Sequence, residues 1–425
     1  MREERGVRVG LGFVLLAVSL TLAVGLGAKA PCASGDWGDG RQYRALCYTD
    51  VVALYSARDL DDDRFPYFEA PNEYPVGTGL FMALGAALSE SHAAFFTVNA
   101  VLLSALAMAT AVGLFLMVGS RALLFAAAPT LAIYAFVNWD LLAVALATFG
   151  TLAFLDRRDI AAGLLLGLGA AAKLYPGLLV VPFAAERLRH GETDRAIHLA
   201  WAASAAWIGL NLPFAVGAFG TWKEFFELNA GRGADWDSLW FSGCHRLFAD
   251  PFWSSRPGCG HVGPINVLSL VLFVGAVALV WWRRGGRVPD FPRWTLGFPL
   301  VALFLLTNKV YSPQYSLWLI PWFALALPRF RLWLAFEAAD ASVFITRFAW
   351  FGREAADRDP SFPSGWTDAF AIGFFEFAVV VRAAIMVACV VAWVRAAPEE
   401  EARQEPLQGR LAAAEPPRGR PAVHP

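Results

Sequence analysis

The chain has 425 residues, of which 57% are hydrophobic and only 17% are charged, and its formal net charge is −1. Soluble globular proteins carry about 25% charged residues, so the composition excludes an ordinary soluble domain and indicates a membrane protein. The near-neutral charge gives no sign of an electrostatic partner, and we expect no nucleic acid to bind.

Five apolar stretches are each long enough to cross a bilayer, which needs roughly 20 apolar residues. They cover residues 9–28, 93–118, 196–218, 264–282 and 370–394. We therefore predict an all-α polytopic membrane protein with one transmembrane domain over residues 1–396. Residues 397–425 are rich in Pro, Glu and Arg and are expected to form a disordered cytoplasmic tail.

The first stretch also resembles a secretory signal, because Ala28-Lys29-Ala30 is a possible cleavage site. Pro31 directly after it should hinder cleavage, and the apolar run is long enough to span. We favour an uncleaved first helix.

Arginine and lysine gather in turns that are expected to face the cytoplasm. Placing all these turns on one side leaves residues 31–75 and 221–262 as two larger extracytoplasmic loops. Residues 160–185 must then cross out and back as two short helices hinged at KLYPG, where Pro176 favours a break. Residues 76–88 are too short to cross and are interpreted as a re-entrant or shallow helix. The total is about twelve crossings, or ten if two pairs merge.

The cysteines agree with this orientation. Cys32 and Cys47 lie in the first outer loop and Cys244 and Cys259 in the second, each pair 15 residues apart. Two local disulfides in an oxidising compartment are predicted, with four free thiols as the alternative.

Carboxylates and aromatic residues concentrate in the first outer loop, a combination that suits sugars because sugar rings offer C–H faces and hydroxyls. The adjacent Asp61, Asp62 and Asp63 are interpreted as a solvated run. Asp50 differs because it opens DVVALYSARDL, whose apolar residues have helical spacing and should lie along the membrane surface. The helix N-terminus should keep Asp50 ionised and able to act as a general base; a plain helix cap is the alternative.

Two lysines are candidate phosphate ligands. Lys173 is an isolated cation in an apolar stretch, which is costly enough to suggest function, although snorkelling to the interface is the alternative. Lys309 lies in TNKVYSPQYSLWLIPW, where Tyr311 and Gln314 add polar contacts. In the second outer loop a substrate-facing group and a disulfide-stapled cap are equally compatible with Arg232, Asp235, Trp236, Asp237, Trp240, His245 and Arg246.

Four segments carry a resemblance to a known family: TDVVALYSARDL, PYFEAPNEYPVGTGLFMAL, GLLLGLGAAAKLYPGLLVVP and NKVYSPQYSLWLIPW. On these the chain resembles the polyprenyl-phosphate-dependent GT-C membrane glycosyltransferases, within them the bacterial α-mannosyltransferases of glycosyltransferase family 87. The resemblance extends to about residue 330. It implies a GT-C-like bundle of about 10 to 12 transmembrane helices in the inner (plasma) membrane, with an extracytoplasmic active site.

The resemblance also implies a reaction and its residues. A sugar, mannose by expectation, moves with inversion from a polyprenyl-phosphate donor to a hydroxyl of a glycolipid or glycan. Asp50 matches the family's base in the pattern D-x-x-x-x-Y, whereas Glu73 departs from the aromatic or polar residue common before Tyr-Pro. We expect no cofactor or metal, because a lipid-phosphate leaving group carries less charge than a nucleotide diphosphate. The residues expected to bind substrate or donor phosphate are Lys173, Lys309, Arg58, Tyr311, Gln314, Glu73, Tyr74, His245 and Arg246.

A transporter or lipid flippase is the main alternative. It would place charges within spans along a pathway, whereas most charges here lie in loops and turns. The exceptions include Asp140, Glu337, Asp340, Arg347, Glu376 and Arg382, and Glu376 and Arg382 are too far apart for an i,i+4 pair. A non-catalytic envelope scaffold would leave Lys173 unexplained.

Overall fold

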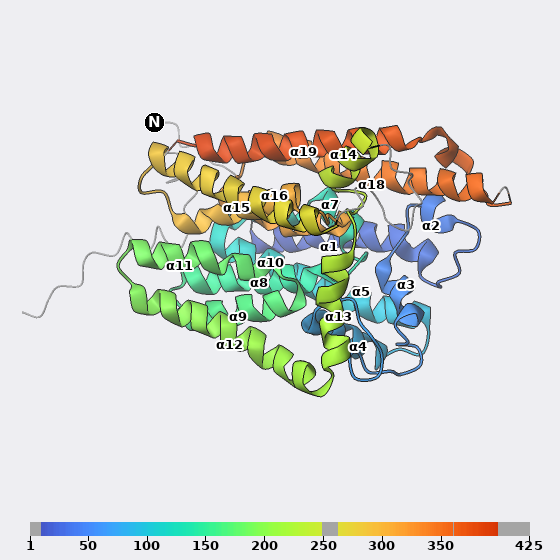
Figure 1. The fold of residues 1–425 in the computed structure, drawn as a ribbon, viewed down its shortest axis with the longest axis horizontal. Coiled ribbons are helices and arrows are strands. Elements are labelled where there is room, and N and C mark those ends of the chain that lie inside the picture. Colours follow the sequence, from blue (N-terminus) through green and yellow to red (C-terminus); the bar gives the residue numbers. More distant parts are fainter. Residues whose placement is uncertain (1–9, 249–261, 360, 398–425) are drawn as a thin grey trace, which may run out of the picture.

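The computed structural model describes residues 10–248, 262–359 and 361–397. Within these ranges the chain forms helices and turns, and no residue belongs to a β-strand. The long helices lie side by side along a common direction (Figure 1). The predicted all-α fold is confirmed.

Five helices in the described ranges are long and apolar enough to cross a membrane. They correspond to the five predicted spans, so the chain is a multi-pass membrane protein. These helices are α1 (Leu11–Lys29), α5 (His92–Val118), α12 (Thr193–Gly217), α15 (Val262–Arg287) and α19 (Ile372–Arg395).

Shorter helices fill the space between the long ones and form the loops. The apolar ones are α4 (Val76–Ala86), α6 (Leu123–Ala126), α7 (Pro129–Tyr134), α8 (Asp140–Leu155), α9 (Asp159–Ala172), α10 (Tyr175–Leu178), α16 (Gly297–Thr307) and α17 (Ile320–Ala326). The others are α2 (Arg41–Arg44), α3 (Asp50–Ala57), α11 (Val180–Arg189), α13 (Phe219–Gly231), α14 (Leu239–Phe248) and α18 (Phe330–Arg358).

The segment 160–185 breaks at the predicted hinge, but the part after the hinge forms the short α10 and the start of α11 instead of one helix. Helix α9 ends at Ala172, and Lys173 follows in an extended conformation with φ −149° and ψ 137°. Pro176 is the second residue of α10, in the first helical turn, where its missing N–H costs no helical hydrogen bond. The hinge points the Lys173 side chain away from the lipid-facing surface, since Lys173 is only 5% exposed.

Helix α9 packs closely on α12 through two glycines. A Cβ atom added at Gly163 or Gly167 would collide with the backbone oxygen of Leu199 or Ala203, respectively. Small residues at such contacts allow the backbones of membrane helices to approach each other. The α9–α12 pair therefore forms a tight support for the hinge.

The arginine-rich turns meet at one end of the bundle. Asp159 accepts from Arg187 at 2.7 Å and from Arg195 at 2.8 Å, and Arg157 pairs with Glu192. In Figure 1 the turn between α11 and α12 lies at the opposite end from α2, α3 and α4. This arrangement agrees with the predicted sidedness of the loops; that the arginine-rich end faces the cytoplasm stays a prediction.

The first outer loop is closed by a disulfide. Cys32 and Cys47 are bonded, with their Cα atoms 5.6 Å apart. This bond ties the end of α1 to the segment that leads into α3. Cys259, the predicted partner of Cys244, and the predicted disordered tail from residue 398 onward lie outside the described residues.

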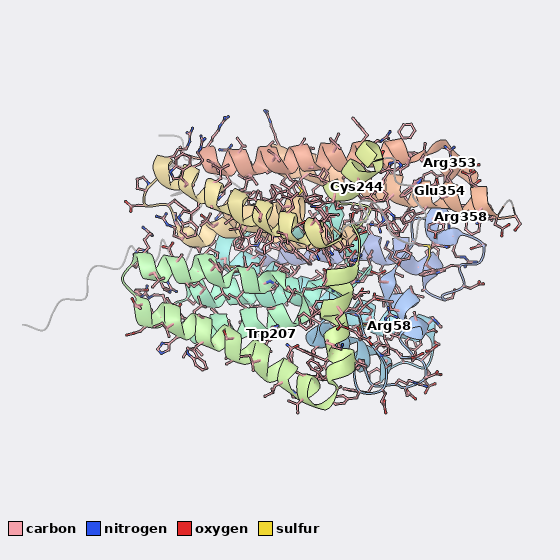
Figure 2. All side chains as sticks on the ribbon, in the orientation of Figure 1. Arg58, Trp207, Cys244, Arg353, Glu354 and Arg358 are labelled. Atoms are coloured by element: carbon pink, nitrogen blue, oxygen red, sulfur yellow. A yellow bond between two sulfur atoms is a disulfide. The ribbon has the colours of Figure 1, made fainter. Side chains whose placement is uncertain are left out.

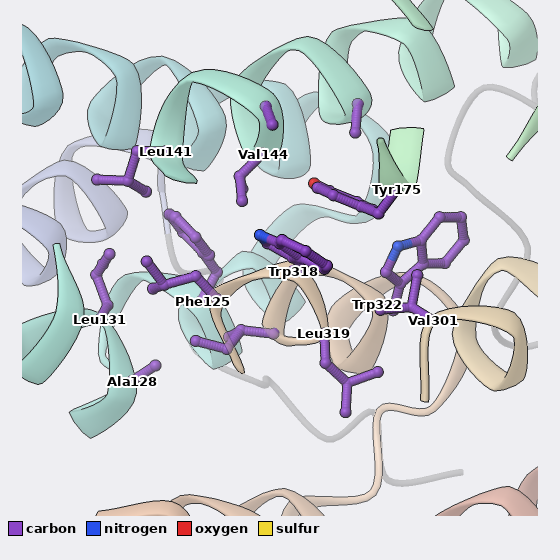
Figure 3. Packing of buried hydrophobic residues seen from close by; sticks show 14 of the residues in the cluster. Phe125, Ala128, Leu131, Leu141, Val144, Tyr175, Val301, Trp318, Leu319 and Trp322 are labelled. Carbon is purple, nitrogen blue, oxygen red and sulfur yellow. The ribbon is translucent and has the colours of Figure 1, made fainter. Parts of the chain in front are cut away.

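A buried aromatic cluster fixes the start of α8. Trp318 stacks on Tyr175 with ring centroids 4.6 Å apart, and Figure 3 shows this pair beside Val144 of α8. The Trp318 indole N–H donates to Asp140 at 2.7 Å. The core therefore holds Asp140, the first residue of α8, close to the hinge. The hinge residues Lys173, Leu174 and Tyr175 line the cavity described below.

Candidate active site

A cavity of about 830 Å³ opens where the two outer loops meet the hinge. Its walls come from the first outer loop, the residues after α9, helix α13, the loop after α13, the turn after α16, and α18. It brings together six of the predicted site residues: Asp50, Glu73, Tyr74, Lys173, Lys309 and Gln314.

Asp50 is the first residue of α3, and its backbone is fixed by a distant segment. Thr49, rather than Asp50, caps the helix by accepting from the Val51 N–H at 3.2 Å. The Thr49 hydroxyl donates to the Phe136 carbonyl at 2.6 Å, and the Asp50 N–H donates to the Val137 carbonyl at 2.8 Å. The start of α3 is thereby held against residues 136–138.

The Asp50 carboxylate is held by two neutral donors. The Tyr48 hydroxyl donates to one oxygen at 2.7 Å, and the Asn138 amide donates to the other at 2.7 Å. Burial raises the pKa of Asp50, while these two hydrogen bonds lower it and the nearby Glu73 charge raises it. The pKa of Asp50 therefore shifts in the opposite direction to the one expected from the helix N-terminus, because removing the carboxylate from water is the largest effect.

Helix α3 also packs differently from the sequence expectation. Val51, Val52 and Tyr55 are buried within the protein, and Tyr55 stacks on Phe95 of α5 with centroids 4.4 Å apart. The apolar face of α3 thus covers another helix, so α3 does not rest on the membrane surface through that face.

Lys173 forms an ion pair that the sequence did not indicate. Its Nζ lies 3.5 Å from a carboxylate oxygen of Asp140, and it lies over the Tyr74 ring at 4.6 Å from the centroid. Both members of the pair are almost fully buried. The Lys173 charge is therefore matched within the protein, and the lysine does not snorkel.

Asn138 connects the carboxylate to this ion pair. Its amide nitrogen donates to Asp50 and also to the Tyr74 hydroxyl at 2.6 Å, and its amide oxygen lies 3.4 Å from the Lys173 Nζ. Asn138 was not among the predicted site residues, because a lone asparagine beside a tryptophan gives no chemical signal. Asp140 was predicted only as an intramembrane charge, without its partner.

Lys309 is held by backbone carbonyls. Its Nζ donates to the Ala230 oxygen at 3.2 Å and to the Arg232 oxygen at 2.7 Å. Among the described residues, no carboxylate forms an ion pair with it, and burial together with the Arg232 charge lowers its pKa. The Lys309 charge thus lacks the compensation that Asp140 gives Lys173.

The loop after α13 joins this lysine to the rest of the cavity wall. The Asp235 N–H donates to the Lys309 carbonyl at 2.8 Å, and the Asp235 side chain accepts from Ser312 at 3.1 Å. Arg232 lies 3.4 Å from the same carboxylate. The loop and the turn after α16 therefore form one continuous wall.

The remaining predicted site residues lie outside the cavity lining. Arg58, labelled in Figure 2, forms an ion pair with Glu73 but does not itself line the cavity. The Tyr311 hydroxyl lies 2.9 Å from that of Ser316 in the buried interior. His245 and Arg246 contact Glu376 at 2.5 and 2.6 Å. The structure does not bring these four residues into the cavity.

Two intramembrane charges that had no explanation from sequence now have partners. Glu376 binds His245 and Arg246, as described above, and Arg382 contacts Asp340 at 3.0 Å.

In the first outer loop, the consecutive residues Asp61, Asp62 and Asp63 are exposed, as expected for a solvated run.

The sequence pattern of Glycosyltransferase family 87 matches residues 73–313. Among solved structures, the chain is similar to the crystal structure of ArnT from Cupriavidus metallidurans bound to undecaprenyl phosphate, with a TM-score of 0.41 and 13% identity, covering 96% of this chain and 82% of that chain. No curated protein matches the chain.

Proposed function

The chain belongs to glycosyltransferase family 87, and on this premise we propose that it transfers a sugar, mannose, from a polyprenyl-phosphate donor to a hydroxyl of a glycolipid or glycan, with inversion at the anomeric carbon. One observation carries the proposal: the Asp50 carboxylate and the uncompensated Lys309 cation line the same cavity. Family membership favours this transfer over the transporter or flippase.

Asp50 is the proposed general base. As the acceptor oxygen bonds to the anomeric carbon, its proton passes to the Asp50 carboxylate and the bond between that carbon and the phosphate oxygen breaks. A base works best when its pKa approaches the working pH, and burial moves the pKa of Asp50 in that direction. Tyr48 and Asn138 orient its two oxygens.

Lys309, with Arg232 beside it, is the proposed ligand of the leaving phosphate. A fixed cation stabilises the negative charge that develops as polyprenyl phosphate departs. Lys173 is less suited because Asp140 already matches its charge. We propose that Lys173 instead positions Asn138, and that the reaction needs no metal.

The proposed site for the lipid chain of the donor lies beside α13. A narrower pocket shares Tyr74 and Leu174 with the main cavity and continues to Trp207 on α12 and Trp222 on α13. Trp207 lies on a helix that can span the membrane, as labelled in Figure 2. The apolar residues of this small pocket are the proposed contacts for the part of the lipid chain next to the phosphate.

The proposed location is the extracytoplasmic face of the inner membrane. The cavity is formed by the two predicted outer loops, whereas the arginine-rich turns meet elsewhere. Positive turns face the cytoplasm in membrane proteins, so the cavity end is expected to face outward. The transmembrane domain over residues 1–396 remains our proposed unit.

The experiment measures transfer of radiolabelled mannose from polyprenyl-phosphate-mannose into lipid and glycan acceptors by membranes that contain the protein, with a chelator present. Asp50→Asn is expected to reduce transfer about 10²- to 10⁴-fold, the range for a lost general base. Asp62→Asn is the matched control, because Asp62 is an exposed carboxylate of the same loop.

Equal transfer by wild type and Asp50→Asn would remove Asp50 as the base. If wild type transfers arabinose or glucose but not mannose from the corresponding donor, the sugar assignment is wrong while the reaction stands. Activity that the chelator abolishes and a divalent cation restores would contradict metal independence.

A further inference from the structure

The cavity differs on the two sides of Asp50. Through Asn138, Asp50 is linked to Lys173 and the cationic side. Through Tyr48, it is linked to an aromatic side: Tyr48 stacks on Phe348 of α18, with centroids 5.2 Å apart and an interplanar angle of 30°. The base therefore lies between two walls of different chemistry.

The aromatic side continues from Phe348 through further rings. Phe348 contacts Phe351 at 5.8 Å, and Phe351 meets Trp236 edge-on at 4.9 Å and Tyr43 at 6.2 Å. Tyr43 comes from α2, Trp236 from the loop after α13 and Phe351 from α18. All three line the cavity and are half-buried. Three separate segments thus present rings to one space.

Arg347 adds polar hydrogen-bonding capacity to these rings. Its guanidinium lies 5.2 Å from the Trp236 ring centroid and 5.3 Å from that of Phe351. Its charge is matched by Asp237 at 2.7 Å. The aromatic wall, which we define as Tyr43, Trp236, Arg347 and Phe351, therefore presents a matched arginine, unlike Lys309 on the other side.

This chemistry selects a class of ligand. An aromatic face packs against the C–H face of a sugar ring, and a tyrosine hydroxyl and a guanidinium can bond to sugar hydroxyls. A phosphate gains less here because the Arg347 charge already has a carboxylate partner. A neutral carbohydrate ring satisfies both the apolar and the polar parts of the wall.

We infer that the aromatic wall is the acceptor subsite and binds a neutral sugar ring of the glycolipid or glycan acceptor, so that one of its hydroxyls meets Asp50. This inference rests on the proposed function and extends it by separating the two substrates in space. The donor phosphate lies on the Lys309 side of the base and the acceptor ring on the Tyr48 side.

The disulfide supports the same wall. Cys32 accepts at its carbonyl from the Trp37 indole N–H at 3.0 Å, and Trp37 packs on Tyr48 at 5.6 Å. The disulfide to Cys47 brackets the segment that carries Trp37 and Tyr43. The first outer loop is thereby held in one arrangement beside α18.

The test uses the purified full chain in lipid nanodiscs with polyprenyl-phosphate-mannose as donor. The acceptor is a glycolipid extract, prepared from the same membranes that show transfer in the first experiment. Each substrate is varied while the other is saturating. Trp236→Ala is expected to raise the half-saturating acceptor concentration about three- to tenfold, the value of one aromatic contact, and to leave the donor value unchanged. Trp236→Phe should retain most acceptor binding.

Trp201→Ala is the matched control, because Trp201 is an exposed tryptophan on α12 that is absent from the cavity lining. An unchanged acceptor value in Trp236→Ala would overturn the inference. An equal rise for both substrates would also overturn it, because it would indicate a collapsed loop. If wild type transfers no sugar from any polyprenyl-phosphate donor, the proposed function itself fails, which is a different result.

Discussion

Two regions of this molecule gather charged side chains, and they hold them in different ways. At the arginine-rich end, Arg187 and Arg195 bind the same Asp159 carboxylate at 2.7 and 2.8 Å. In the cavity, Asp50 is held by a phenol and an amide, and Lys309 by two backbone carbonyls.

The two regions differ in how much of the charge on their side chains remains available to a substrate. A carboxylate and a guanidinium in contact cancel most of each other's field, so such pairs chiefly hold turns together. Neutral hydrogen-bond partners orient a charged group without cancelling its charge. The Lys173–Asp140 pair resembles the arginine-rich end, because its two charges offset each other, although Lys173 lines the cavity.

After Asp50, the largest effect is expected at Lys309. Lys309→Met removes a cation that has no carboxylate partner in the part of the chain that the structure describes, and transfer should fall about 10²- to 10³-fold, as for a lost electrostatic contact in the transition state. Lys309→Arg should recover part of the rate. Initial rates at several donor concentrations measure both variants. If Lys309→Met keeps the rate and Lys173→Met loses it, the phosphate ligand is Lys173.

Asn138 offers a smaller and pH-dependent effect. Its hydrogen bond stabilises the charged carboxylate and lowers the pKa of Asp50, so Asn138→Ala should raise that pKa further. Since the base acts when deprotonated, the acid limb of the pH profile of kcat/KM should move to higher pH in the variant. The variant should therefore be about tenfold slower than wild type at pH values on the acid limb, and the difference should become smaller at higher pH. A limb that stays in place or moves to lower pH would contradict the assignment of Asn138.

The Lys173–Asp140 pair is expected to govern stability more than chemistry. Asp140→Asn leaves the buried ammonium without a carboxylate and should cost about 3–5 kcal/mol of unfolding free energy. Thermal unfolding in detergent measures the change. The double variant Lys173→Met with Asp140→Asn should recover most of the loss, because it removes both charges and keeps an oxygen for the Trp318 indole N–H. A double variant less stable than Asp140→Asn alone would show that the pair is not the source.

The smallest effect is expected at the arginine-rich end. The Arg195 side chain is 41% exposed, and Asp159 keeps Arg187 when Arg195 is replaced. Arg195→Gln should therefore cost less than about 1 kcal/mol and leave both substrate dependences unchanged. A marked loss of transfer in this variant would break the distinction between the two regions.

Much of the fold was predictable because it follows from local chemistry. The five long spans appear where the apolar runs are long enough, and the hinge at Lys173 appears where a proline follows a lysine in an apolar stretch. The apolar face of α3 was predicted to meet lipid and instead packs on α5. Periodicity shows that a face is apolar but does not show what covers it.

The candidate site was predictable in part for the same reason. Asp50, Lys173 and Lys309 are charged residues in apolar surroundings, which makes them conspicuous in the sequence. Asn138 is not conspicuous, and its hydrogen bond to Asp50 joins residues 88 positions apart. His245 and Arg246 were as prominent as the lysines, yet they contact Glu376 and not the cavity.

The sequence by itself determined a multi-pass helical membrane protein with its acidic and aromatic residues in one loop, because hydrophobic length and residue type are properties of single segments. Only the tertiary structure decided which charge meets which partner, because each pairing joins side chains from separate helices and loops. In the described residues, Lys173 pairs with Asp140, whereas Lys309 contacts backbone carbonyls and no carboxylate. Asp50 shares one cavity with Lys309 and with the aromatic wall.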